Sequence, residues 1–213
     1  TRWQTARQVG GDFYDVFKLP DGRLGLVIAD VSDKGMGAAL YMTVARTLIR
    51  ANALNESSPA AVLEKVNNLL LLDAQNGMFV TAIYAILDPL SGLLTLCNAG
   101  HNLPLVMRAA SGQVEVLPKG RLALGVMENT AEENLEIQLE PDDCLLLYTD
   151  GVTESFSPDS QQFGVENLCQ VLAHAIGRSA SQVLNQIDRA LQEFREGQPP
   201  SDDITLLALR RKP

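Results

Sequence analysis

The sequence predicts an α+β fold in which antiparallel sheets are flanked by pairs of helices. Apolar segments rich in β-branched residues follow one another across short turns, which favours hairpins. Segments with helical periodicity occur in adjacent pairs, and the strand–helix–strand alternation typical of a parallel sheet is missing. These three observations place the helices outside sheets that are built mainly from hairpins.

The first half of the chain contains two predicted hairpins with a helix pair between them. Pro20-Asp21-Gly22 is a turn signal between two strand-like segments. Ser58 suits the cap and Pro59 the first turn of the second helix. The expected elements are, in order, strands 8–19 and 24–30, helices 36–55 and 58–74, and strands 79–87 and 93–98.

The second half begins with short strands and returns to helical periodicity before a final strand. Its expected elements are strands 103–108, 114–117, 135–139 and 144–149, helices 165–176 and 180–194, and a last strand over 204–209. Arg210, Arg211 and Lys212 are expected to form a solvated tail. Because no Pro/Gly/Ser-rich or like-charged run divides the chain, we expect residues 1–213 to form a single domain.

Composition describes an ordinary globular protein, with 46% hydrophobic and 20% charged residues among 213. The formal net charge of −9 argues against nucleic acid or an anionic membrane as a partner, because both require basic patches. No apolar run approaches the roughly 20 residues that cross a bilayer, and no signal peptide is visible. Cys97, Cys144 and Cys169 are widely spaced, which favours reduced thiols and a cytoplasmic location over a zinc site.

Four aspartates occur near the ends of apolar strand segments: Asp12, Asp30, Asp150 and Asp202. A carboxylate held at the edge of a core is costly to dehydrate without a cation, and few Lys or Arg residues lie nearby. Oxygen ligands without Cys or His suit Mg²⁺ or Mn²⁺. If the four converge, two such ions about 3.5–4 Å apart would activate a water molecule and hold an attacked phosphoryl group.

Three of these acids also have a local explanation. Asp30 could cap the helix from Met36, Asp150-Gly151 could form an ordinary turn, and Asp202 could be a loop acid. The polar stretch 98–102, NAGHN, is as well explained by a tight turn between strands as by the wall of a site. Phosphate-binding GxxxxGK[ST] and GxGxxG loops and the GxSxG nucleophile motif are all absent from the sequence.

Five motifs in this order and spacing resemble the metal-dependent PPM (PP2C-like) Ser/Thr phosphatases of the bacterial SpoIIE/RsbU branch. They are GGDFYD (10–15), IADVSDKGMGAAL (28–40), NAGHNLPLV (98–106), YTDGVTE (148–154) and SDDITLL (201–207). The resemblance covers essentially the whole chain. It implies a PP2C-like αββα sandwich, with two packed antiparallel sheets flanked by helix pairs.

The resemblance also implies a centre of two Mn²⁺ or Mg²⁺ ions. Asp30 would bridge both ions, and the main-chain carbonyl of Val31 would bind one of them. Asp150 and Asp202 would hold the other ion. Asp12 would face the centre, either directly or through water.

Other positions of the motifs have less definite roles. Gly35 and Gly37 suit the entry into the first helix. Residues that would support the centre, or lie near it without an assigned role, are Asp15, Gly151, Glu154, Asp203 and His101. Eukaryotic relatives carry a basic residue near the first motif that binds phosphate, and neither Arg7 nor Lys18 has the matching position. The charge of the transition state would therefore fall mainly on the metals.

The predicted function is a protein serine/threonine phosphatase that hydrolyses a phosphoprotein with water activated by two metal ions and without a phosphoenzyme intermediate. By resemblance, the substrate would be a small phosphorylated anti-sigma-factor antagonist. The chain would be the C-terminal catalytic part of a longer protein with an upstream sensory or regulatory domain. The helix pair 36–74 is the candidate for regulation by that domain or by a homodimer partner. The alternative is that these helices only cover one sheet.

Two other classes of function share features with this sequence. A non-catalytic phosphatase-like interaction module would usually have lost one of the four strand-end acids, and all four are retained. A two-metal nuclease or cyclase uses similar carboxylates, and GGDFYD superficially resembles the GGDEF signature of diguanylate cyclases. That signature lies in the middle of an alternating α/β domain, whereas here the stretch opens an antiparallel one, and the acidic balance disfavours a nuclease.

Overall fold

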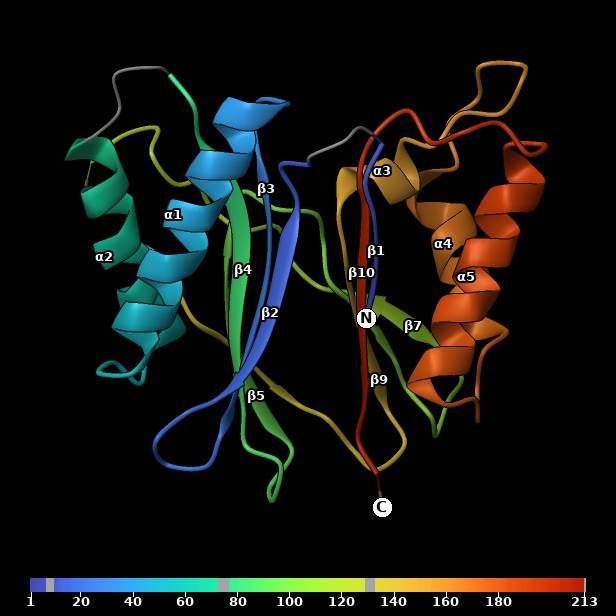
Figure 1. Cartoon of the computed structure of the whole chain (residues 1–213). Helices are drawn as coiled ribbons and strands as arrows, with labels where there is room; N and C mark the ends of the chain where they lie inside the picture. The colour runs from blue at the N-terminus through green and yellow to red at the C-terminus, as the bar shows by residue number, and fades with distance from the viewer. Residues whose placement is uncertain (7–9, 73–76, 129–132, 213) are drawn as a thin grey trace. The chain divides into compact units, whose positions relative to one another are not determined.

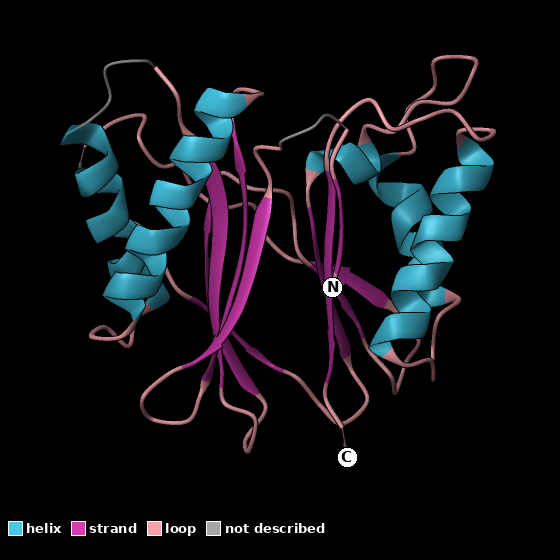
Figure 2. Ribbon diagram, in the orientation of Figure 1, coloured by secondary structure: helices cyan, strands magenta, loops and turns pink. Residues whose placement is uncertain are grey.

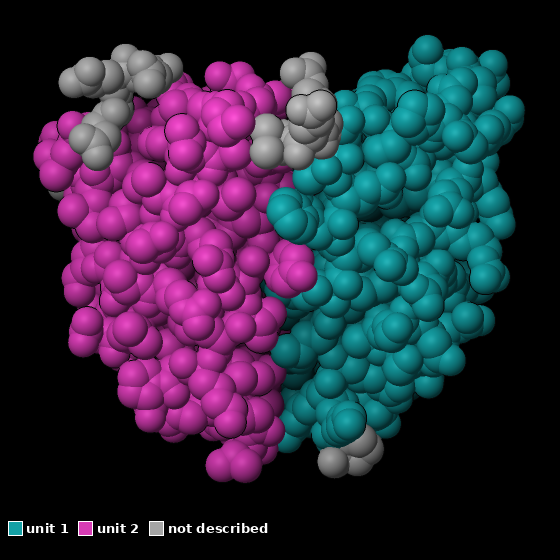
Figure 3. All heavy atoms as spheres, viewed as in Figure 1, with its two compact units in different colours: residues 1–7, 102–118, 139–213 teal, residues 8–101, 119–138 magenta. Residues whose placement is uncertain are grey.

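The computed structural model describes residues 1–6, 10–72, 77–128 and 133–212. The chain divides into two compact units (Figure 3). The residue ranges of the two units interleave along the sequence. Unit 1 comprises Thr1–Arg7, Asn102–Pro118 and Leu139–Pro213, and unit 2 comprises Gln8–His101 and Lys119–Gln138. Each unit contains one five-stranded antiparallel sheet and its own helices (Figures 1 and 2).

Unit 2 contains the predicted hairpins and the first helix pair. Its strands, in spatial order, are β2 (Phe13–Lys18), β3 (Leu24–Val31), β4 (Val80–Leu87), β5 (Leu93–Ala99) and β8 (Leu135–Gln138), and its helices are α1 (Met36–Ala53) and α2 (Pro59–Leu72). Both helices contact this sheet (Figure 1). Ala38 and Ala45 of α1 are fully buried in the core between helices and sheet, because their short side chains allow the helix backbone to approach the strands closely.

The turns and caps of unit 2 follow the local chemistry of the sequence. Gly22 has a φ of 92° in the turn between β2 and β3, a conformation that favours glycine. Gly35, with a φ of 94°, is the N-cap of α1 and offers no capping side chain. At α2 the Ser58 hydroxyl accepts a hydrogen bond of 3.3 Å from the Ala61 N–H, as expected for a cap. Gly37 is an ordinary helical residue with open space around it, so the expected need for glycine there is not seen.

Unit 1 contains the remaining strands and the second helix pair. Its strands, in spatial order, are β1 (Arg2–Gln4), β10 (Ile204–Arg210), β9 (Cys144–Tyr148), β6 (Leu105–Met107) and β7 (Val114–Val116). Its helices are α3 (Asp150–Thr153), α4 (Gly164–Ala173) and α5 (Ala180–Phe194). Leu172 and Ile187 are fully buried in a core shared with the central strands. A capping box between Ser179 and Gln182 begins α5.

The predicted α+β class, with antiparallel sheets and helix pairs, is confirmed. Two elements were missed. The three residues of β1 are exposed and owe their strand conformation to pairing with β10, where Arg2 faces Leu206. Helix α3 is a single turn, too short to show a periodicity. Residues 8 and 9 of the first predicted strand and 73 and 74 of the second predicted helix lie outside the described residues.

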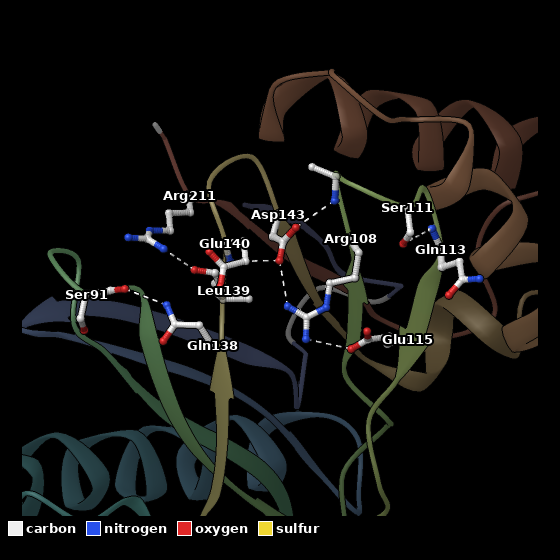
Figure 4. A network of polar contacts seen from close by, with 11 residues as sticks. Ser91, Arg108, Ser111, Gln113, Glu115, Gln138, Leu139, Glu140, Asp143 and Arg211 are labelled. Atoms are coloured by element: carbon white, nitrogen blue, oxygen red, sulfur yellow. Dashed lines mark hydrogen bonds and ion pairs between the residues drawn. The ribbon is translucent and has the colours of Figure 1, made fainter.

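The expectation of a solvated tail at 210–212 is wrong for its two arginines. Arg210 is the last residue of β10, and its guanidinium contacts Asp142 at 2.8 Å and the carbonyl of Arg178 at 2.8 Å. Arg211 donates to the carbonyl of Leu139 at 2.5 Å (Figure 4). These partners come from distant parts of the chain, so the arginines fasten the end of the sheet.

A buried ion pair lies close to this strand end. The Asp143 side chain, 2% exposed, pairs with Arg108 at 2.8 Å and also accepts hydrogen bonds from the main-chain N–H groups of Ala109 and Glu140 (Figure 4). Arg108 contacts Glu115 of β7 at 2.9 Å as well. Burial opposes ionisation of Asp143, but the hydrogen bonds from Ala109 and Arg108 outweigh it and the pKa is lowered.

The three cysteines are free thiols, as expected, with Cys97 and Cys144 buried and Cys169 partly buried. Burial raises the pKa of Cys144 to about 11, so this thiol stays protonated and unreactive at neutral pH. In the described part of the chain, every helix is too short or too polar to cross a membrane.

Candidate functional site

Unit 2 brings two of the predicted acids together at one end of its sheet. Asp12 directly precedes β2, and Asp30 is the penultimate residue of β3. Phe13 of β2 pairs with Ala29 of β3. Because the two strands are antiparallel, the residue before Phe13 faces the residue after Ala29, and Asp12 therefore lies opposite Asp30. Asp12 is 2% exposed and Asp30 is partly buried. Two carboxylates therefore share this strand end.

Gly11 explains part of the opening motif. A β-carbon at this position would lie 3.2 Å from the carbonyl oxygens of Val31 and Asp33, closer than most such contacts. The chain before Asp12 therefore runs against the backbone that follows Asp30. The Val31 carbonyl, which the resemblance gives as a metal ligand, lies at this same strand end.

Asp15 makes a different kind of contact. Its carboxylate pairs with Arg46 and Arg50 of α1, each at 3.0 Å, and its side chain is 9% exposed. Arg50 also lies over the ring of Phe17, 5.0 Å from the centroid. Asp15 thus fastens α1 to β2, and these two arginines compensate its charge.

Unit 1 brings the other acids to one end of its own sheet. Asp150 follows β9 and is the first residue of α3, while Asp203 directly precedes β10. The Thr149 N–H donates to the Thr205 carbonyl at 3.1 Å, so the end of β9 lies beside the start of β10. A β-carbon on Gly151 would lie 2.0 Å from the carbonyl oxygen of Asp203. Any side chain at Gly151 would push α3 away from the acidic loop.

Asp202 and Asp203 have separate contacts in this loop. The Asp202 carboxylate accepts a hydrogen bond of 2.8 Å from the Asp203 N–H. The Asp203 carboxylate, on a residue 7% exposed, accepts a hydrogen bond of 2.7 Å from the Ala6 N–H. Asp203 therefore braces the N-terminal segment against the loop that carries Asp202.

Two of the local explanations for the acids do not match the structure. Gly35, rather than Asp30, is the N-cap of α1. Asp150 begins a short helix instead of a turn, and the exposed Glu154 caps that helix with its N–H on the Asp150 carbonyl. Within the described residues, no three His, Cys, Asp or Glu side chains are grouped closely enough to hold a metal ion.

Of the two basic residues near the first motif, Lys18 is not at the acidic strand end of unit 2. Lys18 is exposed and ends β2, whereas Asp12 precedes the start of that strand. Arg7 lies outside the described residues.

Thr81 was not among the residues predicted to lie at the site. This residue lies on β4 opposite Asp30, and its hydroxyl is 2.8 Å from Nδ1 of His101. His101 itself is 3% exposed. The available signal was a single threonine in the otherwise apolar and aromatic segment FVTAIYAIL, at the strand position next to the acid-bearing strand end.

Comparison with known proteins identifies the family of the chain. The sequence model of the family described as Stage II sporulation protein E (SpoIIE) matches residues 20–212. Protein IcfG of Synechocystis sp. is 30% identical over 98% of this chain and 37% of its own length. Phosphoserine phosphatase RsbU of Bacillus subtilis is 28% identical over 97% of this chain and 61% of its own length. The chain thus spans less than two thirds of the length of either relative.

Solved structures show the same fold. The SiaA-PP2C domain of Pseudomonas aeruginosa superimposes with a TM-score of 0.87 at 23% identity, covering 98% of this chain and 84% of that domain. This likeness confirms the predicted PP2C-like fold.

Proposed function

Since the chain belongs to the SpoIIE family, the bacterial PPM phosphatase domains of the SpoIIE/RsbU type, we propose that it is a metal-dependent protein serine/threonine phosphatase. The observation that supports this most directly is the position of the family's acids. Asp12 lies opposite Asp30 in one unit, and Asp150 lies beside the loop of Asp202 in the other. A non-catalytic relative would have no need for carboxylates at both strand ends.

The donor set fits a pair of hard divalent cations. The acids are held at sheet ends, and the glycines Gly11 and Gly151 let the backbone approach them closely. Carboxylate and carbonyl oxygens are the ligands preferred by Mg²⁺ and Mn²⁺. When bound, two such ions would supply an activated water molecule and neutralise charge on the phosphoryl oxygens.

In this proposal the residues of the chain hold and orient the ions. Asp30 and the Val31 carbonyl would be the metal ligands contributed by unit 2, and Asp150 and Asp202 those contributed by unit 1. Asp12 would act as a further ligand, directly or through water. Asp203 and Gly151 would support the loop that carries Asp202. The Asp203 carboxylate accepts from the Ala6 N–H, and Gly151 lies against the main chain of Asp203.

The proposed substrate is a phosphorylated protein of the anti-sigma-factor antagonist type. The support is the family and the RsbU relative, whose name describes a phosphoserine phosphatase. We also propose that residues 1–213 act as one catalytic domain within a longer protein that carries a regulatory domain.

Metal removal tests the proposed activity. We expect hydrolysis of p-nitrophenyl phosphate and of a phosphoserine peptide in Mn²⁺ or Mg²⁺, and loss of both activities in EDTA that added Mn²⁺ restores. The measurement is the initial rate at a series of metal concentrations. Equal rates with and without metal would contradict the proposal, and phosphoprotein binding without any turnover would favour the non-catalytic module.

Helix α1 offers a surface for regulation. Met36, Leu40 and Val44 follow one another at one-turn spacing and are 67%, 64% and 46% exposed, respectively. Because α1 follows the Asp30 strand end after a short loop, movement of the helix would reach that end directly. We propose that this apolar stripe binds the regulatory domain or a second copy of the chain.

Leu40→Lys tests this surface in the full-length protein. A charge in an apolar contact is costly. We therefore expect a lower sedimentation coefficient if the stripe binds a second copy of the chain, or a smaller increase in hydrolysis rate on activation if it binds the regulatory domain. Gln192→Lys on the exposed side of α5 is the matched control. If Leu40→Lys left both self-association and the hydrolysis rate unchanged, the stripe would have no regulatory role.

A further inference from the structure

The NAGH stretch at 98–101 is a buried polar turn that the proposed function does not use. Asn98 closes it with both ends of its amide: the His101 N–H donates to Oδ1 at 2.8 Å, and Nδ2 donates to the His101 carbonyl at 3.2 Å. Gly100 has a φ of 70°, and a β-carbon there would lie 2.8 Å from the Ala123 nitrogen. The main chain at His101 is therefore held in one place within unit 2.

The ring connects to the acid-bearing strand through one hydroxyl. Nδ1 of His101 lies 2.8 Å from Oγ1 of Thr81 on β4. Thr81 is paired with Asp30 across the β3–β4 ladder, and its hydroxyl donates to the Asp30 carbonyl in a long hydrogen bond of 3.4 Å. A chain of polar contacts thus runs from His101 through Thr81 to the main chain of Asp30.

The number of protons fixes the direction of these bonds. A threonine hydroxyl has one hydrogen and a carbonyl oxygen can only accept, so both contacts of Thr81 are hydrogen bonds only when its hydrogen is directed to the Asp30 carbonyl. The hydroxyl oxygen can then only accept from the imidazole, which requires a proton on Nδ1 of His101. We infer that Thr81 and His101 are positioning residues that hold the Asp30 end of β3, with His101 as the Nδ1–H tautomer.

This arrangement matters for the proposed metal centre, and its functional part rests on that proposal. Asp30 and the Val31 carbonyl are adjacent ligands, so fixing the main chain at Asp30 fixes both of them. Loss of a group that orients a metal ligand typically lowers metal affinity about 10–100-fold. Because Thr81 acts on the backbone rather than on the carboxylate, we expect the lower end, about tenfold.

Calorimetric titration of the apo protein with Mn²⁺ tests the positioning role. Thr81→Val keeps the shape of the side chain but removes the hydroxyl, so we expect about tenfold weaker Mn²⁺ binding. Thr81→Ser keeps the hydroxyl and should bind nearly as the wild type does. Thr95→Val on the neighbouring strand β5 is the matched control for a threonine-to-valine change in this sheet. Unfolding midpoints of all variants exclude misfolding as the cause.

The tautomer is tested without metal or activity. The chain has two histidines, so His174→Gln leaves His101 as the only imidazole for ¹⁵N–¹H correlation NMR. In this variant we expect the His101 imidazole to give the correlation pattern of the Nδ1–H tautomer. We expect that pattern to change when Thr81→Val is added. An Nε2–H pattern would overturn the proposed direction of the bonds.

The outcomes separate this inference from the proposed activity. Wild-type protein that binds Mn²⁺ without hydrolysing phosphopeptides would contradict only the phosphatase. Thr81→Val binding Mn²⁺ as tightly as the wild type would contradict only the positioning role. Wild-type protein without Mn²⁺ or Mg²⁺ binding would overturn the metal centre and, with it, the functional part of this inference.

Discussion

Replacing Asp150 with asparagine is expected to lower kcat/KM for a phosphoserine peptide by more than about 100-fold, since even residues that only orient metal ligands commonly cost 10–100-fold. The amide keeps the size of the side chain but loses the charge and one of two strong oxygen ligands. Its effect should therefore fall on metal binding and not on the fold. Initial rates measure kcat/KM, and titration of the same preparations with Mn²⁺ measures the metal affinity.

Asp159→Asn is the matched control for this change. Asp159 belongs to the same unit and is exposed in the loop that follows α3, so the substitution removes one negative charge without touching the strand end. It should leave the rate and the Mn²⁺ affinity unchanged. Activity of Asp150→Asn comparable to that of this control would exclude Asp150 as a metal ligand.

The second large effect concerns stability. Asp143→Ala should lower the free energy of unfolding by about 3 kcal/mol, at the lower end of the range for a broken buried ion pair. The substitution leaves the N–H groups of Ala109 and Glu140 without their acceptor, and Arg108 without its buried partner. The lower end applies because Arg108 is 23% exposed and keeps its contact with Glu115. Urea denaturation followed by circular dichroism measures the difference.

The matched control is the neighbouring residue. Asp142 pairs with Arg210, but its side chain is 40% exposed, so Asp142→Asn should cost no more than about 1 kcal/mol. Asparagine also tolerates the φ of 71° at this position. Equal losses for Asp142→Asn and Asp143→Ala would show that burial of Asp143 adds nothing.

The pH dependence of this effect has a definite sign. The pKa of Asp143 is lowered in the folded protein. In the unfolded chain the pKa of an aspartate is about 3.9. The stabilisation is therefore fully present above the unfolded pKa and is lost as the pH falls through the folded pKa. The difference in stability between wild type and Asp143→Ala should narrow below about pH 4, measured in the same urea series at several pH values.

Much of the fold follows from local sequence signals. The turn at Pro20-Asp21-Gly22 and the cap at Ser58 are each determined by a few neighbouring residues, and both were predicted. The strand-end positions of Asp30 and Asp150 also follow from the apolar runs before them. Periodicity and turn chemistry are therefore sufficient to place these acids on their elements.

The features that were missed depend on residues far apart in the chain. Strand β1 requires the edge of β10, and Arg210 ends in polar contacts with Asp142 and Arg178. Asp15 could be recognised as an acid of the first motif, but its pairing with Arg46 and Arg50 depends on how α1 packs on β2. Single-sequence patterns contain no signal for such pairings, because the partners are brought together only by tertiary structure.

The interleaving of the two units has a consequence for folding during synthesis. Residues 10–101 of unit 2, with four of its strands and both its helices, leave the ribosome as one stretch and can begin to pack early. The sheet of unit 1 cannot close until β10 is made, because β10 lies between β1 and β9. Until then, the wholly apolar strand β9 has an open edge on which other chains can pair. Emergence of β10 from the ribosome is thus the step at which this open edge is covered.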